Sequence, residues 1–268
     1  GNTVGGTNAG DSFTGTDATK NTLLGYDAGT AITTGDWNIA LGHSALKSAT
    51  TAGANIAIGY EAAKNLSSAT GTTFIGWQAA NNGVLTGAYN VGVGYSSGYQ
   101  LTTGYSNVFL GTQAGYGTTT GYENTYIGQD AGGGWEGTGN NNIAVGHNCM
   151  QGAAVTGAGN IGMGQGAFNS LTSGTYNVAI GYEALNSIDG ASKSVAIGYR
   201  AGKAATNYTT SVFIGEEAGI VATSGGGNVM IGRKAGHSTT SPSDNTFIGN
   251  EAGQYNELGH SNTGIGFR

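Results

Sequence analysis

The sequence predicts an all-β fold, a parallel β-solenoid of about sixteen coils, each about 17 residues long. The first observation is a tandem repeat, because one glycine recurs at a nearly constant spacing of about 17 residues. A few steps are one residue longer, and the step from Gly6 to Gly25 is two residues longer. The second observation is a short run of β-branched or aromatic residues before most of these glycines, which is typical of a strand. The repeated glycines are Gly6, Gly25, Gly42, Gly59, Gly76, Gly94, Gly111, Gly128, Gly146, Gly164, Gly181, Gly198, Gly215, Gly232, Gly249 and Gly266.

Composition excludes several other classes of protein. Glycine accounts for 53 of the 268 residues, proline for 1, and charged residues for only 9%. Collagen needs glycine at every third position with abundant proline, and disordered chains are usually rich in charge, so neither class fits. The net charge of −6 forms no basic stripe, which argues against nucleic acid as a partner. No apolar run approaches the roughly 18 residues of a membrane span, so we expect no membrane insertion within this segment.

The repeats run through the whole chain, so we expect one tandem-repeat β-solenoid domain over residues 1–268. No linker, charge run or change in composition marks a boundary. Asn2 already begins a repeat and Arg268 ends inside one, so we expect a fragment of a longer fibre protein.

Each repeat is numbered p1 to p17, with p1 usually asparagine and p5 the recurrent glycine. The stretch Asn245–Gly253 covers p1 to p9 of one repeat. We expect p2 to p4 to form a strand. After p9, a connection that often carries one apolar residue leads to a threonine-rich turn such as Thr102–Gly104, in which glycine supplies a positive φ. Each coil is therefore expected to contain two short strands.

Side chains at p3 and p9 compensate each other in volume. Phe109 at p3 occurs with Gly115 at p9, whereas Ala40 occurs with Leu46. Close packing inside a protein requires such compensation, so we expect p3 and p9 to share one interior space. Three pairs break the pattern: Gly92 with Gly98, Ala196 with Gly202, and Phe74 with Ala80.

Positions p2 and p4 are usually apolar as well, as in Val195 and Ile197. Side chains alternate along a strand, so p2 and p4 point away from p3. A strand that is apolar on both faces is covered on both, and one coil covers only its inner face. We therefore predict a homo-oligomer about the solenoid axis, with a C3 homotrimer favoured.

The repeats resemble those of two related groups of fibrous proteins. Ser194–Gly198, Asn177–Gly181 and Asn55–Gly59 look like the Asn-Ser-Val-Ala-Ile-Gly repeats of trimeric autotransporter adhesin heads. The longer form, Asn-Thr-Phe-Ile-Gly-x-x-Ala-Gly with Thr-Thr-Gly turns, is similar to trimeric β-roll repeats of phage tail-fibre proteins. The resemblance implies a parallel trimer of left-handed β-rolls in an extracellular or virion fibre. It implies no binding site, because those repeats are structural.

We predict no catalytic, metal or cofactor site and no enzymatic activity. Residues Gly94–Gly98 match the nucleophile-elbow pattern G-x-S-x-G, but both glycines belong to the repeat and no helix pattern follows. Cys149 occupies p8, which is alanine in thirteen of the fifteen complete p1–p9 stretches, so we interpret it as a small buried side chain. His43 and His147 share p6 but lie about six repeats apart, too far for one metal ion.

Aromatic residues at p6 form the one candidate binding site. Tyrosine and tryptophan combine an apolar face with a polar group, so a row of them suits stacking with sugars of a cell-surface glycan or receptor. The alternative is that they pack on the adjacent coil or on a partner chain. The candidate residues are Tyr60, Trp77, Tyr95, Tyr182 and Tyr199, with the first three the densest run.

Position p7 alternates in charge near the end of the chain. Its residues there are Glu183, Arg200, Glu217, Lys234 and Glu251. Opposite charges on neighbouring strands stabilise a sheet by less than about 1 kcal/mol per pair, so this column predicts a structural row of ion pairs.

These observations favour a non-enzymatic structural segment of a trimeric extracellular fibre, either a bacteriophage tail fibre or a bacterial surface adhesin. It would serve as a rigid shaft or head that also binds host-surface glycans, and we expect it at the cell surface or on a virion. An ice-binding solenoid is the first alternative, because threonine pairs recur at one turn. A polysaccharide-degrading tailspike is the second, although the acidic residues fall mostly singly at p7.

Overall fold

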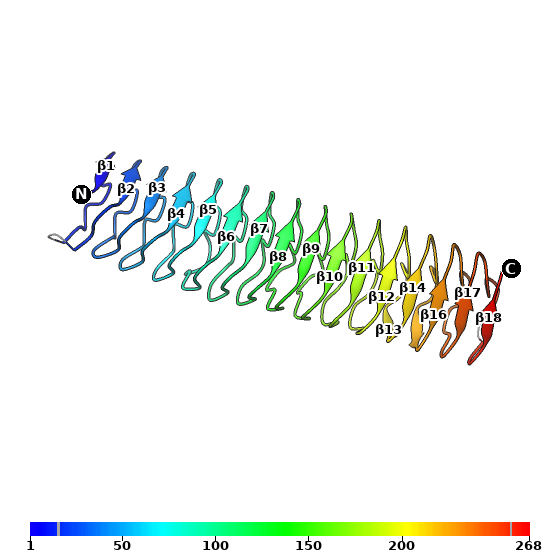
Figure 1. The fold of residues 1–268 in the computed structure, drawn as a ribbon. Helices are drawn as coiled ribbons and strands as arrows, with labels where there is room; N and C mark the ends of the chain where they lie inside the picture. Colours follow the sequence, from blue (N-terminus) through cyan, green and yellow to red (C-terminus); the bar gives the residue numbers. More distant parts are fainter. Residues whose placement is uncertain (15–16, 258) are drawn as a thin grey trace. The chain divides into compact units, whose positions relative to one another are not determined.

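The structure is a computed structural model that describes residues 1–14, 17–257 and 259–268. Every regular element in this part of the chain is a short strand. The chain divides into two compact units, residues 1–138 and 139–268. Figure 1 shows, within each unit, successive coils whose strands lie side by side. The predicted all-β parallel solenoid with its regular repeat length is confirmed, whereas a single domain over 1–268, the left-handed coil and the trimer stay predictions.

The first unit contains eight parallel strands in its described part, paired in chain order. Neighbouring strands pair at the repeat spacing, as in Ile39 with Ile56 and Ala40 with Ala57. The strands are β1 (Thr3–Gly5), β2 (Thr22–Leu24), β3 (Ile39–Leu41), β4 (Ile56–Ile58), β5 (Thr73–Ile75), β6 (Val91–Val93), β7 (Val108–Leu110) and β8 (Thr125–Ile127).

The second unit repeats this arrangement with eight parallel strands in the described part and adds a small two-stranded sheet. The main strands are β9 (Ile143–Val145), β10 (Ile161–Met163), β11 (Val178–Ile180), β12 (Val195–Ile197), β14 (Val212–Ile214), β16 (Val229–Ile231), β17 (Thr246–Ile248) and β18 (Thr263–Ile265). The small sheet pairs β13 (Asn207–Thr209) with β15 (Ser224–Gly226). Among the described residues there is no helix with the length and hydropathy that a membrane crossing requires.

The turn from p5 to p9 separates inward from outward side chains. Gly111 at p5 has φ of 141°, and a Cβ there would lie 2.5 Å from the carbonyl oxygen of Gly128 in the next coil, so only glycine fits. Left-handed conformations follow at p7, where Gln113 has φ of 56°, and at p9, where Gly115 has φ of 63°. Within this turn Ala114 at p8 is buried, whereas most p6 residues are exposed and most p7 residues are half-buried.

The interior of each coil is filled mainly from p3, p8, p9 and p12. Phe109, Leu46 and Leu101 represent p3, p9 and p12, and all three are fully buried. The apolar residue expected in the connection after p9 is therefore part of the core. Burial of a leucine or phenylalanine side chain contributes roughly 1.5–3 kcal/mol, so the core is distributed over the coils rather than concentrated at one point.

The predicted sharing of space by p3 and p9 is confirmed. A Cβ added to Gly219 would lie 2.5 Å from Cδ1 of Phe213 at p3 of the same coil. Likewise, a Cβ added to Gly253 would lie 2.5 Å from Cδ1 of Phe247. A large p3 ring that lies beside p9 of its own coil therefore leaves no room for a side chain there, as close packing requires.

Buried asparagines at p1 connect each coil to the next. Nδ2 of Asn38 donates to the carbonyl oxygen of Ala52 near the end of its own coil, at 2.9 Å. Oδ1 of Asn38 accepts from the backbone N–H and from Nδ2 of Asn55 in the next coil, each at 3.1 Å. The same arrangement recurs along both units, for example from Asn160 to Asn177. Each p1 amide therefore closes one coil and holds the next.

The expectation of two strands in every coil is wrong for most coils in the described part. The p1 side chain donates a hydrogen bond to the carbonyl oxygen at p15, which is then not available for strand pairing. Position p17 has a left-handed φ, as in Trp37 with φ of 64°. Both features interrupt regular strand pairing near the end of a coil. The additional strands β13 and β15 lie in the two coils that begin with Ser194 and Ser211 in place of asparagine.

Candidate functional site

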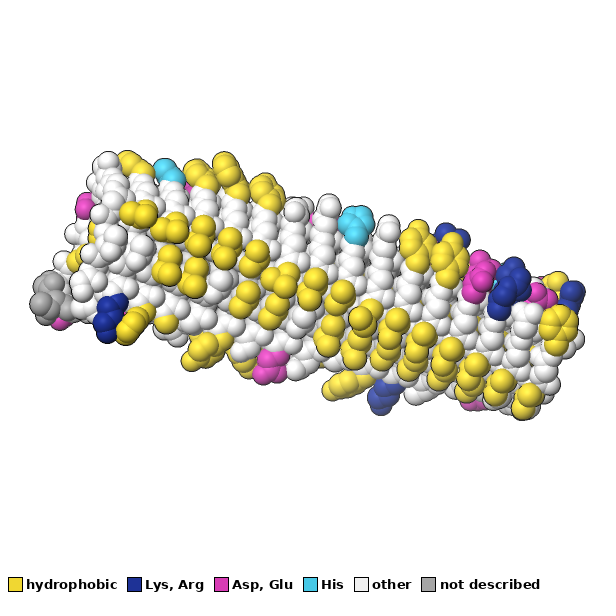
Figure 2. Space-filling view, turned by 45° about the horizontal axis from the view of Figure 1, so that its top comes forward, with side chains coloured by type: hydrophobic (Ala, Val, Ile, Leu, Met, Phe, Trp, Pro, Cys, Tyr) yellow, Lys and Arg dark blue, Asp and Glu magenta, His cyan; other side chains and the backbone are white. Residues whose placement is uncertain are grey.

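The outward side chains of p6, p7 and p10 form the face that carries the predicted aromatic site. Position p6 contributes aromatic rings, and p7 and p10 contribute charged and amide groups. Figure 2 shows hydrophobic side chains in rows along the outside of each unit, with charged side chains between some of them.

Aromatic rings at p6 of the first unit form a continuous stack. Tyr26 stacks on His43 with centroids 5.2 Å apart, and His43 stacks on Tyr60 at 5.2 Å. Tyr60 then stacks on Trp77 at 4.4 Å with an interplanar angle of 23°. Inside this stack the ring faces contact each other, so mainly edges and polar groups face outward. The rings thus pack on the adjacent coil, and sugar binding by the stack stays a prediction.

The other predicted aromatic residues divide between a pair and a separate ring. Tyr182 and Tyr199 stack at 5.4 Å, and the guanidinium of Arg200 lies 4.9 Å from the Tyr199 centroid. The step from Trp77 to Tyr95 is one residue longer than the usual repeat, and no aromatic ring in the described part of the chain stacks on Tyr95. The structure therefore brings together Tyr60 with Trp77 and Tyr182 with Tyr199, but leaves Tyr95 apart.

Three further groups of aromatic residues were not among the predicted site residues. Tyr26 and His43 belong to the p6 stack described above. Tyr99 stacks on Tyr116 at 5.0 Å, and Tyr105 stacks on Tyr122 at 4.8 Å. The two members of each tyrosine pair lie one repeat apart, so a search of every repeat position for consecutive aromatic residues would have found them.

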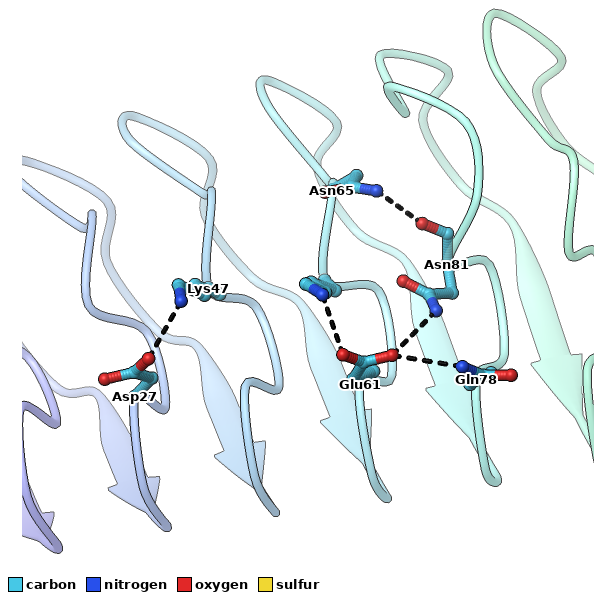
Figure 3. A network of polar contacts seen from close by, with 7 residues as sticks. Asp27, Lys47, Glu61, Asn65, Gln78 and Asn81 are labelled. Atoms are coloured by element: carbon cyan, nitrogen blue, oxygen red, sulfur yellow. Dashed lines mark hydrogen bonds and ion pairs between the residues drawn. The ribbon is translucent and has the colours of Figure 1, made fainter.

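Carboxylates at p7 are paired with groups at p7 and p10 of the same or later coils. Glu61 accepts from Lys64 of its own coil at 2.7 Å. It also accepts from Gln78 and Asn81 of the next coil, at 3.0 and 3.1 Å (Figure 3). Asp27 contacts Lys47 of the next coil at 2.8 Å. These contacts join coils on the outer surface.

The predicted row of alternating charges is realised in part. Glu183 contacts Arg200 at 2.8 Å and Lys203 at 2.7 Å. Glu217 lies 3.6 Å from Lys234. Glu251 contacts Arg233 at p6 instead of Lys234 at p7. The column therefore forms cross-coil ion pairs, with p10 and p6 side chains as additional partners.

These pairings keep the carboxylates ionised. The hydrogen bond from Lys203 has the largest effect and lowers the pKa of Glu183. Burial opposes it, and the hydrogen bond from Arg200 lowers the pKa further. The Lys64 hydrogen bond likewise lowers the pKa of Glu61, with further help from Gln78. A general acid needs a raised pKa, so neither carboxyl group is suited to protonate a leaving group.

Cys149 is fully buried, as its p8 position predicts. Burial raises the pKa of its thiol to about 12, so the reactive thiolate does not form near neutral pH. Within the described part of the chain, no three histidine, cysteine, aspartate or glutamate side chains come together in a group suited to a metal ion.

Comparison with known protein families gave no matching family model, and comparison with curated proteins gave no matching sequence. The likeness of the repeats to those of trimeric adhesins and tail fibres is therefore a likeness of short motifs.

Proposed function

We propose that this chain is a non-enzymatic structural segment of a homotrimeric extracellular fibre, of the tail-fibre or surface-adhesin kind. Regular coils, a distributed core and hydrogen bonds between successive coils suit a stiff segment. The cross-coil ion pairs and the lowered pKa values at p7 support a structural rather than a catalytic role. An extracellular or virion location follows from the role and forms part of the proposal.

The main support for a trimer is a column of apolar p4 side chains on the outer face of the strands. Several large p4 side chains in both units are 36–45% exposed. Members of this column are Leu24, Val93, Ile127, Met163, Ile180, Ile197 and Ile248. A partner that covers every coil must repeat at the same spacing as the coils. A second and third copy of this chain have that spacing, which favours self-association over an unrelated partner.

Light scattering on the purified chain tests this proposal. We expect about three times the chain mass of 26.6 kDa. Ile180→Lys places a charge in the apolar column and should shift the mass towards that of one chain, while Ser170→Lys at an exposed position should leave it unchanged. A stable, folded single chain of the wild-type sequence would contradict the trimer.

The ice-binding alternative is less well supported. The Thr102 hydroxyl donates to the carbonyl oxygen of Thr119 at 3.0 Å, and that of Thr223 donates to the carbonyl oxygen of Thr240 at 3.1 Å. These hydroxyls thus serve the contact between coils. An ice-binding face would instead present them to water in a flat array. A thermal-hysteresis measurement separates the two functions.

A further inference from the structure

The p7 column has one gap, at Gly166 in the second unit. Every other p7 position carries a side chain. Because residue 166 has no side chain, a partly open pocket of about 280 Å³ lies beside the buried Gly166. Around it lie Asn148, Gln165, Asn169, Tyr182, Glu183 and Asn186, all of them polar. Sites for drug-sized ligands span about 300–1,000 Å³, so this pocket suits a smaller group of about one sugar ring.

Hydrogen bonds fix much of the pocket wall. Nδ2 of Asn186 donates to the carbonyl oxygen of Gly166 at 2.9 Å. Nδ2 of Asn169 donates to the carbonyl oxygen of Asn148 at 3.4 Å. The Glu183 carboxylate is held by Arg200 and Lys203. Because these groups are already positioned, a ligand need not order them on binding.

The remaining polar groups match a neutral polyol. Among the residues that the structure describes, the side-chain amides of Asn148 and Gln165 have no hydrogen-bond partner. Each amide offers two donor hydrogens and an acceptor oxygen, and a sugar hydroxyl is both donor and acceptor. The Glu183 carboxylate is paired with Arg200 and Lys203, which are not among the residues that line the pocket, so the lining presents no unpaired charge that would select an ion.

Tyr182 supplies an apolar surface at one side of the pocket. One face of its ring stacks on Tyr199 of the next coil. The other face is on the side of the preceding coil, where p6 is Gln165 instead of an aromatic residue. A pyranose ring has one face rich in C–H groups, which packs well on such an aromatic ring.

From this geometry we propose that the Gly166 pocket binds one neutral pyranose unit of a surface glycan. The proposal deepens the fibre function, which supplies the reason to meet a glycan, but the pocket lies within one chain and needs no trimer. A single ring of about 12 non-hydrogen atoms should bind weakly, with Kd on the order of 1 mM. Repeated copies of the pocket in a fibre would raise the avidity for a multivalent surface.

Gly166→Gln is the decisive variant. A Cβ at Gly166 would lie 3.5 Å from its nearest neighbours, Nδ2 of Asn186 and Cγ of Glu183, so the substitution fits. The φ of 65° is also compatible, because Gln78 and Gln113 occupy the same column at 53° and 56°. The new side chain restores the regular column and fills the pocket without requiring a change of fold.

Gly190→Gln is the matched control. It introduces the same side chain in the same unit, at an exposed turn outside the pocket lining. A Cβ there meets only the rotatable Ser173 hydroxyl, at 3.2 Å. Both variants should retain the circular-dichroism spectrum and unfolding midpoint of the wild-type chain within a few degrees.

Saturation-transfer NMR with the methyl glycosides of glucose, galactose, mannose and N-acetylglucosamine measures binding, with N-acetylneuraminic acid as a charged probe. We expect the wild type and Gly190→Gln to bind at least one neutral glycoside, and Gly166→Gln to lose that binding at least tenfold. No binding of any neutral glycoside, or unchanged binding by Gly166→Gln, would overturn the pocket proposal, as would binding confined to the charged sugar. Light scattering on the same samples tests the trimer separately, so each proposal can fail alone.

Discussion

The ring of Phe74 occupies the space beside Gly92 of the next coil. A Cβ added to Gly92 would lie 2.6 Å from Cδ1 and 2.7 Å from Cε1 of that ring. The Phe74 ring thus extends into the interior of the neighbouring coil and leaves room for the alanine at p9 of its own coil. In the neighbouring coil the ring fills the space that a side chain at residue 92 would need. Two pairs that break the p3–p9 pattern, Phe74 with Ala80 and Gly92 with Gly98, therefore have one cause.

Gly92→Ala should destabilise the protein although it lies in strand β6. Replacing a strand glycine by alanine ordinarily stabilises by about 0.5–1 kcal/mol, because the unfolded chain loses freedom. Here the added methyl overlaps the Phe74 ring, and overpacking typically costs about 1–3 kcal/mol. Chemical denaturation should show a decrease in the free energy of unfolding.

The double variant Phe74→Ala with Gly92→Ala provides the control. Once the ring is removed, the alanine methyl fills part of the space and should raise stability relative to Phe74→Ala alone. We therefore expect Gly92→Ala to lower the free energy of unfolding when residue 74 is phenylalanine and to raise it when residue 74 is alanine. An equal effect in both backgrounds would contradict the packing explanation.

The third unexplained pair, Ala196 with Gly202, also depends on neighbouring residues. A Cβ at Gly202 would lie 2.8 Å from Leu185 of the preceding coil and 2.9 Å from Phe213 of the following one. Tyr208, buried in the same coil, adds volume from p15. Sequence columns predicted the interior positions correctly, but not the direction in which each side chain leans, because that direction is set by packing between coils.

The p1 column shows a second limit of prediction from the sequence. The repeat pattern identified its asparagines only as the first residue of each repeat, yet they form a buried hydrogen-bonded ladder in place of the second strand expected in most coils. Periodicity located these residues correctly. Their partners could not be predicted, because the carbonyl at p15 comes within reach only once the coil has closed.

Asn107→Ala should strongly destabilise the first unit. Asn107 donates to Gly121 at 2.8 Å and to Asn90 at 3.0 Å, and it accepts from the Asn124 backbone N–H at 3.0 Å. Truncation leaves buried polar groups without these partners, each costing about 1–3 kcal/mol. We expect a loss of about 2–5 kcal/mol in chemical denaturation, with faster hydrogen exchange at the Asn124 amide.

Two variants calibrate that result. Asn107→Ser should lose less stability, because serine occupies p1 at Ser194 and Ser211 and can retain one hydrogen bond. Asn82→Ala removes the same amide from an exposed position and should change stability by less than about 0.5 kcal/mol. A comparable loss for Asn82→Ala and Asn107→Ala would refute a special role for the ladder.

Tyr208→Phe should stabilise the second unit. The Tyr208 hydroxyl is buried and has no hydrogen-bond partner among the described residues, while its ring packs against Phe213 with centroids 5.4 Å apart. Removing the oxygen retains the packing and abolishes the cost of burying an unpaired polar group, about 1–3 kcal/mol. Thermal unfolding should move to higher temperature, and an unchanged or lower midpoint would count against this explanation.

The candidate binding site was less predictable than the fold. The sequence columns placed Tyr182 on the outer face, but the Gly166 pocket was not predicted. In the sequence it is marked by the one glycine in the p7 column, with Asn169 at p10 of the same coil and Asn186 at p10 of the next. A missing side chain creates a cavity only when its neighbours do not fill the space, and that outcome depends on three-dimensional packing.

Stability should fall at alkaline pH in part through Cys149. Burial raises the pKa of its thiol to about 12 in the folded chain, whereas an unfolded cysteine ionises near 8.5. The resulting stability is fully present below the unfolded pKa and is lost as pH rises towards the folded one, by at most about 1.4 kcal/mol per pH unit. Denaturation between pH 8.5 and 9.5 is most informative, because most tyrosines and lysines ionise above that range.

Cys149→Ala isolates this contribution, because alanine already occupies p8 in most coils. The variant should lose stability less steeply with pH than the wild type over this interval, and the two curves should run parallel below about pH 8. Tyr208→Phe gives an independent comparison, because burial also raises the pKa of the Tyr208 hydroxyl, so its effect should begin about one to two pH units higher. If the free energy of unfolding falls equally steeply with pH for Cys149→Ala and the wild type from pH 8.5 to 9.5, burial does not suppress ionisation of the thiol, contrary to the structure.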